Sequence, residues 1–228
     1  MGYYGSMILL IPAIIFTMYA QTKVQSAYRT YLRVANSTGL TGADAARRIL
    51  DKNGLANIPV VITPGTLTDN YNPMRHVMNL SNDVFHGSTI ASIAIAAHES
   101  GHAIQHAQGY KLLQIRNSIV PIANIGSTLS WPLLIFGLML GRSGDFLFNL
   151  GIVMFLGVVL FHLVTLPVEL DASRRALVQL QEMGALRTGQ ELSGARAVLS
   201  AAALTYVAAL ATAIANLLRM FAMRGNRR

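Results

Sequence analysis

The sequence contains no cysteine, and only 12% of its 228 residues are charged. Without cysteine the chain cannot form a disulfide framework, and any metal site must use histidine, aspartate or glutamate. Soluble domains carry about twice this charged fraction. The 53% share of hydrophobic residues and the positive mean hydropathy therefore predict an integral membrane protein with a modest polar part.

Acidic residues are scarce as well, because 10 Asp and Glu stand against 18 Lys and Arg, which gives a net charge of +8. An excess of this sign is typical of loops that face anionic lipid headgroups. A nucleic-acid surface is the alternative reading, but no basic run is interleaved with aromatic residues in the way that single-strand binding requires. We therefore expect the lipid bilayer as a partner and no nucleic acid.

Four apolar stretches are candidates to cross a bilayer, which takes roughly 20 residues. The first in the chain, Met7 to Ala20, is short for this and can cross when it is extended back to Tyr3, whereas the other three are near or above spanning length. The first lies in an N-terminal anchor at 1–22. The second and third, at 119–140 and 146–166, form a transmembrane hairpin spanning 118–167, because only a short polar segment separates them. The fourth lies in a C-terminal apolar helix with a basic tail, 197–228, although an Ala-rich helix of a soluble core would look similar. The predicted fold class is mainly α, a polytopic membrane protein with about four transmembrane helices.

Lysine and arginine are distributed unequally between the two sides that these spans would separate. Residues 21–117 carry nine and residues 168–196 carry four, whereas the opposite side would carry five, most of them in the C-terminal tail. The positive-inside rule then places the polar parts in the cytoplasm. No Lys or Arg precedes Lys23, which favours a retained anchor over a cleaved signal peptide.

A membrane-proximal part at 23–117 has the signals of a small, zincin-like α+β unit. Thr41 and Asp44 have the spacing of a capping box, which marks the start of a helix. Short β-branched runs bounded by Pro, Gly or Asn predict strands further along. The expected elements are a helix at 42–52, strands at 58–63 and 77–81, a polar loop at 67–73 between them, and a helix at 88–108.

His98, Glu99 and His102 form the pattern H-E-x-x-H on the last of these helices. Residues four apart lie on one face of a helix, so the two imidazoles can bind one cation, with Glu99 placed beside them to act on a water. A chain with this number of His and Glu would contain about 0.003 such matches by chance. The motif therefore predicts one Zn²⁺ per chain, with Glu99 as general base.

A zinc hydrolase site needs a third protein ligand. We expect Glu169, in a polar segment at 168–196, because two apolar helices would run across the membrane and return it to the same face as the two histidines. Pro167 suits a helix start, and an acid that interacts with the helix dipole is the alternative role of Glu169. His106 lies one more turn along the metal helix and cannot reach the same ion as the other two histidines.

Further polar side chains are candidates for orienting a ligand or stabilising the oxyanion. Asp171 is expected to orient a ligand imidazole. Tyr71, Arg174 or Arg175 could donate to the oxyanion, and the two arginines could instead pair with acids or face headgroups. The strand at 77–81 precedes the metal helix and could pair with an extended substrate.

Four segments, in one order along the chain, carry a family resemblance. They read Thr-Gly-Ala-Asp-Ala-Ala-Arg-Arg-Ile-Leu-Asp (41–51), Leu-Thr-Asp-Asn-Tyr-Asn-Pro (67–73), Ala-Ala-His-Glu-Ser-Gly-His-Ala-Ile-Gln (96–105) and Leu-Pro-Val-Glu-Leu-Asp-Ala-Ser-Arg-Arg-Ala (166–176). The chain resembles the YugP-type membrane zinc metallopeptidases of bacteria, which implies a zinc peptidase of the inner or plasma membrane. In that family the second segment usually reads Asp-His-Tyr-Asp-Pro, where this chain has Asn70 and Asn72.

The order of motifs is also similar to that of the HtpX and CAAX-processing membrane proteases. In those enzymes H-E-x-x-H is followed by two membrane helices and a ligand Glu, which implies Glu169 as the third ligand. They typically carry an Asp four residues after that Glu. Ser173 stands at that position here, so it joins Asp171 as a candidate for the orienting role.

These observations predict a membrane-embedded zinc endopeptidase that hydrolyses peptide bonds of membrane or membrane-proximal proteins, with its active site facing the cytoplasm. One alternative is a non-catalytic scaffold or assembly partner in a membrane protein complex, whose structural metal would need four protein ligands. Another is a metal transporter, which would need polar residues along its spans. The predicted hairpin is nearly apolar.

Overall fold

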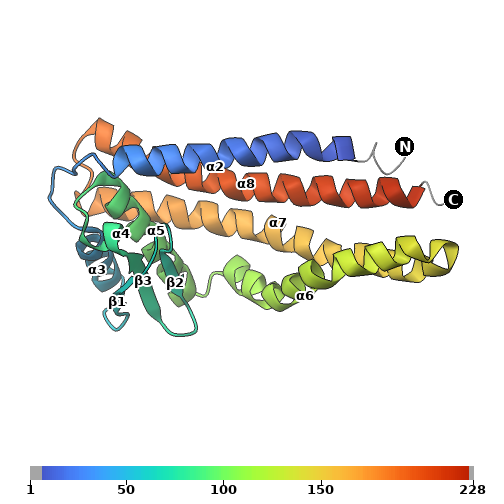
Figure 1. Ribbon diagram of the computed structural model, residues 1–228. Coiled ribbons are helices and arrows are strands. Elements are labelled where there is room, and N and C mark those ends of the chain that lie inside the picture. Colours follow the sequence, from blue (N-terminus) through green and yellow to red (C-terminus); the bar gives the residue numbers. More distant parts are fainter. Residues whose placement is uncertain (1–6, 226–228) are drawn as a thin grey trace. The chain divides into compact units, whose positions relative to one another are not determined.

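The computed structural model describes residues 7–225, and the chain divides into two compact units (Figure 1). Unit 1 comprises Met1–Ala20, Lys111–Pro167 and Thr205–Arg228, and unit 2 comprises Gln21–Tyr110 and Val168–Leu204. Helices α2 (Ile11–Tyr31), α7 (Asp145–Glu182) and α8 (Gly189–Gly225) contribute residues to both units. Unit 1 also holds η1 (Ile8–Leu10), α6 (Lys111–Met139) and η2 (Gly141–Gly144). The other elements of unit 2 are three helices, α3 (Gly42–Lys52), α4 (Asn82–His86) and α5 (Ile90–Ala107), and three strands, β1 (Val60–Thr63), β2 (Asn70–Asn72) and β3 (Val77–Ser81).

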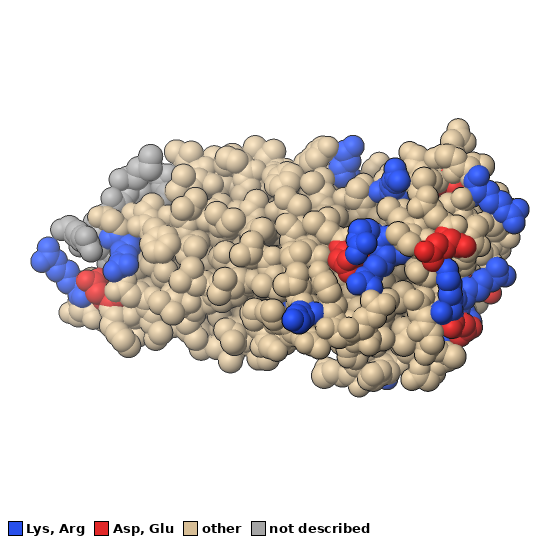
Figure 2. Space-filling view, turned by 180° about the vertical axis from the view of Figure 1, so that it is seen from behind, with Lys and Arg blue, Asp and Glu red and all other residues tan. Residues whose placement is uncertain are grey.

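Four helical segments are long and apolar enough to cross a membrane, which confirms the predicted fold class of a mainly α chain with a small α+β part. They are Ile8–Tyr31, Lys111–Met139, Gly141–Glu182 and Gly189–Gly225. Large apolar side chains are exposed along them, including Ile8, Phe136 and Phe146. Figure 2 shows a wide surface without charged side chains, while Lys, Arg, Asp and Glu gather in patches.

Within unit 1, α6 and α7 pack closely because small residues lie where the two helices meet. A side chain at Gly126 would place its Cβ 2.5 Å from the Met154 carbonyl oxygen, and one at Gly151 would lie 2.9 Å from that of Ser130. Membrane helices approach through small residues of this kind. The hairpin expected from the sequence is therefore held by backbone proximity as well as by the buried Leu134 and Phe148.

Pro167 does not begin a helix, contrary to the expectation from the sequence. It lies inside α7, which continues without a break to Glu182. An internal proline removes one backbone hydrogen bond and strains the preceding turn, and membrane helices tolerate it because other groups satisfy the freed carbonyls. The apolar run before Pro167 is already helical, so the polar residues after it extend that helix.

The sheet of unit 2 has the strand order β1-β3-β2. β3 is parallel to β1, with Val60 opposite Met78, and antiparallel to β2, with Tyr71 opposite Met78. β2 lies in the segment expected to be a loop, because β3 supplies its partner. The predicted pairing of a substrate with 77–81 is wrong, since both edges of β3 are already hydrogen-bonded to strands.

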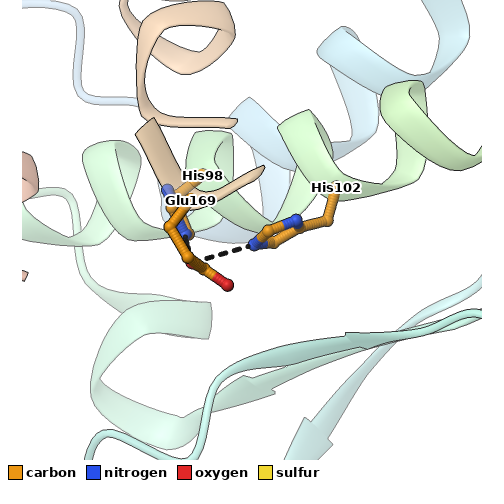
Figure 3. Close-up of side chains that lie close together, drawn as sticks. All are labelled: His98, His102 and Glu169. Carbon is orange, nitrogen blue, oxygen red and sulfur yellow. Dashed lines mark hydrogen bonds and ion pairs between the residues drawn. The ribbon is translucent and has the colours of Figure 1, made fainter. Parts of the chain in front are cut away.

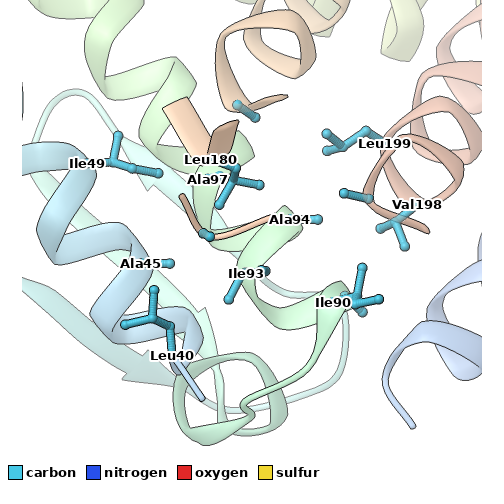
Figure 4. Packing of buried hydrophobic residues seen from close by; sticks show 14 of the residues in the cluster. Leu40, Ala45, Ile49, Ile90, Ile93, Ala94, Ala97, Leu180, Val198 and Leu199 are labelled. Atoms are coloured by element: carbon cyan, nitrogen blue, oxygen red, sulfur yellow. The ribbon is translucent and has the colours of Figure 1, made fainter. Parts of the chain in front are cut away.

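Helix α5 is the buried centre of unit 2, and its packing is shown in Figure 4. One cluster joins α5 to α3, α7 and α8, and a second joins it to the buried face of the sheet through Met78 and Leu80. The Thr89 side chain caps the helix by accepting from Ser92 N–H, a contact worth about 1 kcal/mol. Each buried Ile contributes about 1.5–3 kcal/mol, so packing fixes the position of α5 more than its cap does.

Candidate metal centre

Two elements of unit 2, α5 and the polar end of α7, meet at the H-E-x-x-H motif. Gly101 lies between the two histidines, and a Cβ there would fall 2.6 Å from the carbonyl oxygen of Ala172. Only a residue without a side chain allows α7 to come this close. The approach brings Glu169, which lies one turn before Ala172 on α7, to the face of α5 that carries His98 and His102.

The three side chains expected to bind the metal converge in space (Figure 3). Glu169 Oε2 lies 3.3 Å from His98 Nε2 and 3.4 Å from His102 Nε2. Two ligands at 2.0–2.1 Å from a tetrahedral zinc ion are separated by about 3.3–3.4 Å, so these spacings fit zinc. Within residues 7–225 this is the one group of three His, Asp or Glu with ligand atoms within 4.8 Å of one another.

The Glu99 carboxylate is buried next to this group. Its Oε2 accepts a hydrogen bond from the backbone N–H of Tyr71 in β2, at 2.9 Å. Burial raises the pKa of the Glu99 carboxyl, while the neighbouring His98 and His102 rings oppose that shift. A carboxylate with a raised pKa, fixed at one oxygen, is suited to accept a proton at the other.

Each candidate ligand histidine is oriented by a hydrogen bond at its second ring nitrogen. Ser173 Oγ lies 3.2 Å from His98 Nδ1, and Gln105 Oε1 lies 3.0 Å from His102 Nδ1. Contacts of this kind leave Nε2 of each ring for the metal. Ser173, four residues after Glu169, thus contacts a candidate ligand imidazole. The HtpX and CAAX-processing proteases typically carry aspartate at this position.

Asp171 does not contact either imidazole, and it acts on His102 only through Gln105. The Gln105 amide donates to Asp171 Oδ2 and to the carbonyl oxygen of Val168, both at 2.9 Å. Gln105 was not among the residues predicted from the sequence to position a ligand. The signal was available, because it follows His102 by three residues on the same helix, which places both on one face.

The three oxyanion candidates are engaged with other groups. The Tyr71 hydroxyl lies 2.9 Å from His106 Nδ1. The guanidinium groups of Arg174 and Arg175 both contact the Asp171 carboxylate. In the described part of the chain, these side chains make their hydrogen bonds to groups other than the three candidate ligand atoms.

The chain is similar to known proteins over far more than the helix that carries H-E-x-x-H. A family model described as "Putative neutral zinc metallopeptidase" matches residues 6–225. The protein named "Putative membrane protease YugP" from Bacillus subtilis (strain 168) is 46% identical over 211 residues, which covers 92% of this chain and 92% of that protein. No solved structure matches the chain. Both similarities cover nearly the whole sequence, including its apolar helices.

Proposed function

The chain belongs to the neutral zinc metallopeptidase family, and we propose that it is a membrane-embedded zinc endopeptidase that hydrolyses peptide bonds of membrane or membrane-proximal proteins. The strongest support is the buried Glu99 carboxylate beside three ligand atoms with zinc spacing. A structural zinc site is closed by four protein ligands, whereas a catalytic one uses three. The group of three found here therefore favours catalysis over a scaffold with a structural metal.

In this proposal His98, His102 and Glu169 hold one zinc ion per chain. When bound, zinc supplies a Lewis acid that polarises the scissile carbonyl and lowers the pKa of a bound water to about 7. Glu99 accepts the proton of the attacking water and delivers it to the leaving amine. Because the Tyr71 N–H holds Glu99 Oε2, Oε1 is the oxygen that carries the proton.

Removal of the metal tests this function directly. Purified full-length chain in detergent is expected to cleave a casein-like or membrane protein substrate, and to lose at least about 95% of this activity on treatment with a zinc chelator. One equivalent of Zn²⁺ should restore activity, and Mg²⁺ should not, because two imidazoles and one carboxylate suit zinc. Proteolysis that persists in the metal-free chain would refute the proposal, and a zinc-loaded chain that cleaves none of these substrates would favour the scaffold.

We also propose that unit 2 faces the cytoplasm of a bacterial cell, in a chain that crosses the membrane several times. The excess of Lys and Arg in 21–117 and 168–196 supports this orientation.

Because the chain has no native cysteine, a single introduced cysteine can be labelled selectively. Arg48→Cys, at an exposed position of α3, should react with a membrane-impermeant maleimide only from the cytoplasmic side, and Arg142→Cys in η2 only from the outside. The reverse pattern would overturn the orientation.

A further inference from the structure

A pocket of about 200 Å³ in unit 2 lies outside the candidate metal centre. It is lined by Arg174 and Arg175 of α7, by Asn53, Gln108 and Gln179, and by the apolar Ile104 and Val178, and none of these residues is acidic. The volume is several times the roughly 30 Å³ that one water occupies in the liquid. From this lining we propose that the pocket binds a phosphate group.

The charges around the pocket leave an excess of one positive charge. Arg174 Nη2 donates to Asp171 Oδ1, and Arg175 Nε donates to Asp171 Oδ2. One carboxylate is therefore shared by two guanidinium groups. Because each guanidinium carries five N–H donors, this sharing leaves donors on both arginines for an anion.

The two arginines differ in exposure and in the number of groups that hold them, and both differences suit anion capture. The side chain of Arg175 is 20% exposed and is held by Asp171, by Gln108 Oε1 at 2.6 Å, and by the ring of Tyr110, 5.8 Å from its guanidinium carbon. The side chain of Arg174 is 69% exposed. A fixed inner guanidinium and an accessible outer one can contact different oxygens of one phosphate, a group that arginine recognises with paired N–H bonds.

The phosphate has two possible sources, an anionic phospholipid headgroup and free phosphate. The sequence favours the lipid, because Arg174 and Arg175 follow the apolar run 146–166 by fewer than ten residues. Basic residues that follow a membrane span directly attract anionic headgroups, at about 1 kcal/mol for each charge. Asn53 Nδ2 donates to Ile49 O and to Gln179 Oε1, and Gln108 Oε1 accepts from Arg175, so the amide NH₂ groups of Gln108 and Gln179 are the neutral donors around the same pocket.

Arg174 is the residue to change in a test, because its exposed side chain can be replaced without disturbing the fold. Arg175 is unsuitable, since it donates to Asp171 Oδ2, the oxygen that also accepts from Gln105, which contacts His102, whereas Arg174 donates to the other oxygen, Oδ1. Val178→Phe is a second variant, because it fills the pocket without a change of charge. Arg196→Gln is the matched control, since Arg196 is exposed on α8 and does not line the pocket.

The experiment compares phospholipid retention and phosphate binding in the full-length chain. Native mass spectrometry would measure retained phosphatidylglycerol against phosphatidylcholine, and calorimetry in phosphatidylcholine nanodiscs would measure inorganic phosphate. Arg174→Gln is expected to weaken phosphatidylglycerol binding about tenfold, through the loss of one charge-assisted contact. Val178→Phe is expected to weaken it as well, because the larger side chain occupies the pocket, while Arg196→Gln leaves it unchanged. The same loss for inorganic phosphate would identify free phosphate as a ligand too.

Two results would overturn the proposal. One is that neither pocket variant changes the binding of phosphatidylglycerol or of phosphate. The other is that Arg196→Gln weakens binding as much as Arg174→Gln, which would indicate a general charge effect. Binding is measured without peptide hydrolysis, so these results are independent of the proposed peptidase activity.

Discussion

Replacing Glu99 by glutamine is expected to lower the rate of peptide hydrolysis at least a hundredfold while the chain keeps its zinc. General acid–base catalysis contributes about 10²–10⁴-fold, and an amide cannot take a proton from water. The fold should survive, because the amide oxygen of glutamine can still accept from Tyr71 N–H. Burial already opposes the ionised form of Glu99, so a neutral side chain at this position does not add a desolvation penalty.

The matched control for this change is Glu182→Gln at the end of α7. Glu182 is about half exposed and pairs with Lys52, and surface pairs of this kind contribute little to stability. Activity and zinc content of the control should equal those of the unmodified chain. Full proteolysis by the Glu99 variant would refute the general-base role, and loss of zinc would mean that Glu99 supports the metal instead of moving a proton.

Local patterns in the sequence predicted helix α5 correctly, because their causes lie within a few residues. The H-E-x-x-H spacing and the helical run around it fix the shared face of His98 and His102. The capping box of Thr41 and Asp44 is present as predicted, with both reciprocal hydrogen bonds. Strands β1 and β3 likewise lie where β-branched and alternating residues indicated them.

Features that depend on a distant partner could not be predicted in this way. Strand β2 consists of Asn-Tyr-Asn, a sequence typical of a turn, and it becomes a strand because β3 is available to pair with it. A proline can stand at the start of a helix or inside one. For Pro167, the helical residues that precede it decide that it lies inside α7. The contact of Gln105 with Asp171 joins α5 to α7, 66 residues apart in sequence.

Removing the Glu169 carboxylate is expected to abolish stoichiometric zinc binding. Removing the Gln105 amide is expected to lower the zinc affinity by a smaller factor. Residues that orient a ligand typically contribute about 10–100-fold to metal affinity, which is the loss expected for Gln105→Leu. Glu169→Ala should exceed this loss, because it removes one of the three candidate ligand atoms and the only charged one among them. Both effects can be measured as zinc per chain after equilibration with a series of chelator concentrations.

Matched controls separate a lost ligand from a general loss of fold. Gln181→Ala and Glu182→Ala change exposed residues near the end of the same helix, α7, and should retain zinc fully. If Glu169→Ala binds zinc as tightly as the controls, another residue supplies the third ligand and the 3.3 Å and 3.4 Å spacings have no bearing on the metal. If Gln105→Leu loses as much zinc as Glu169→Ala, the His102 ring depends on Gln105 for its position, and orientation contributes as much to the site as the carboxylate.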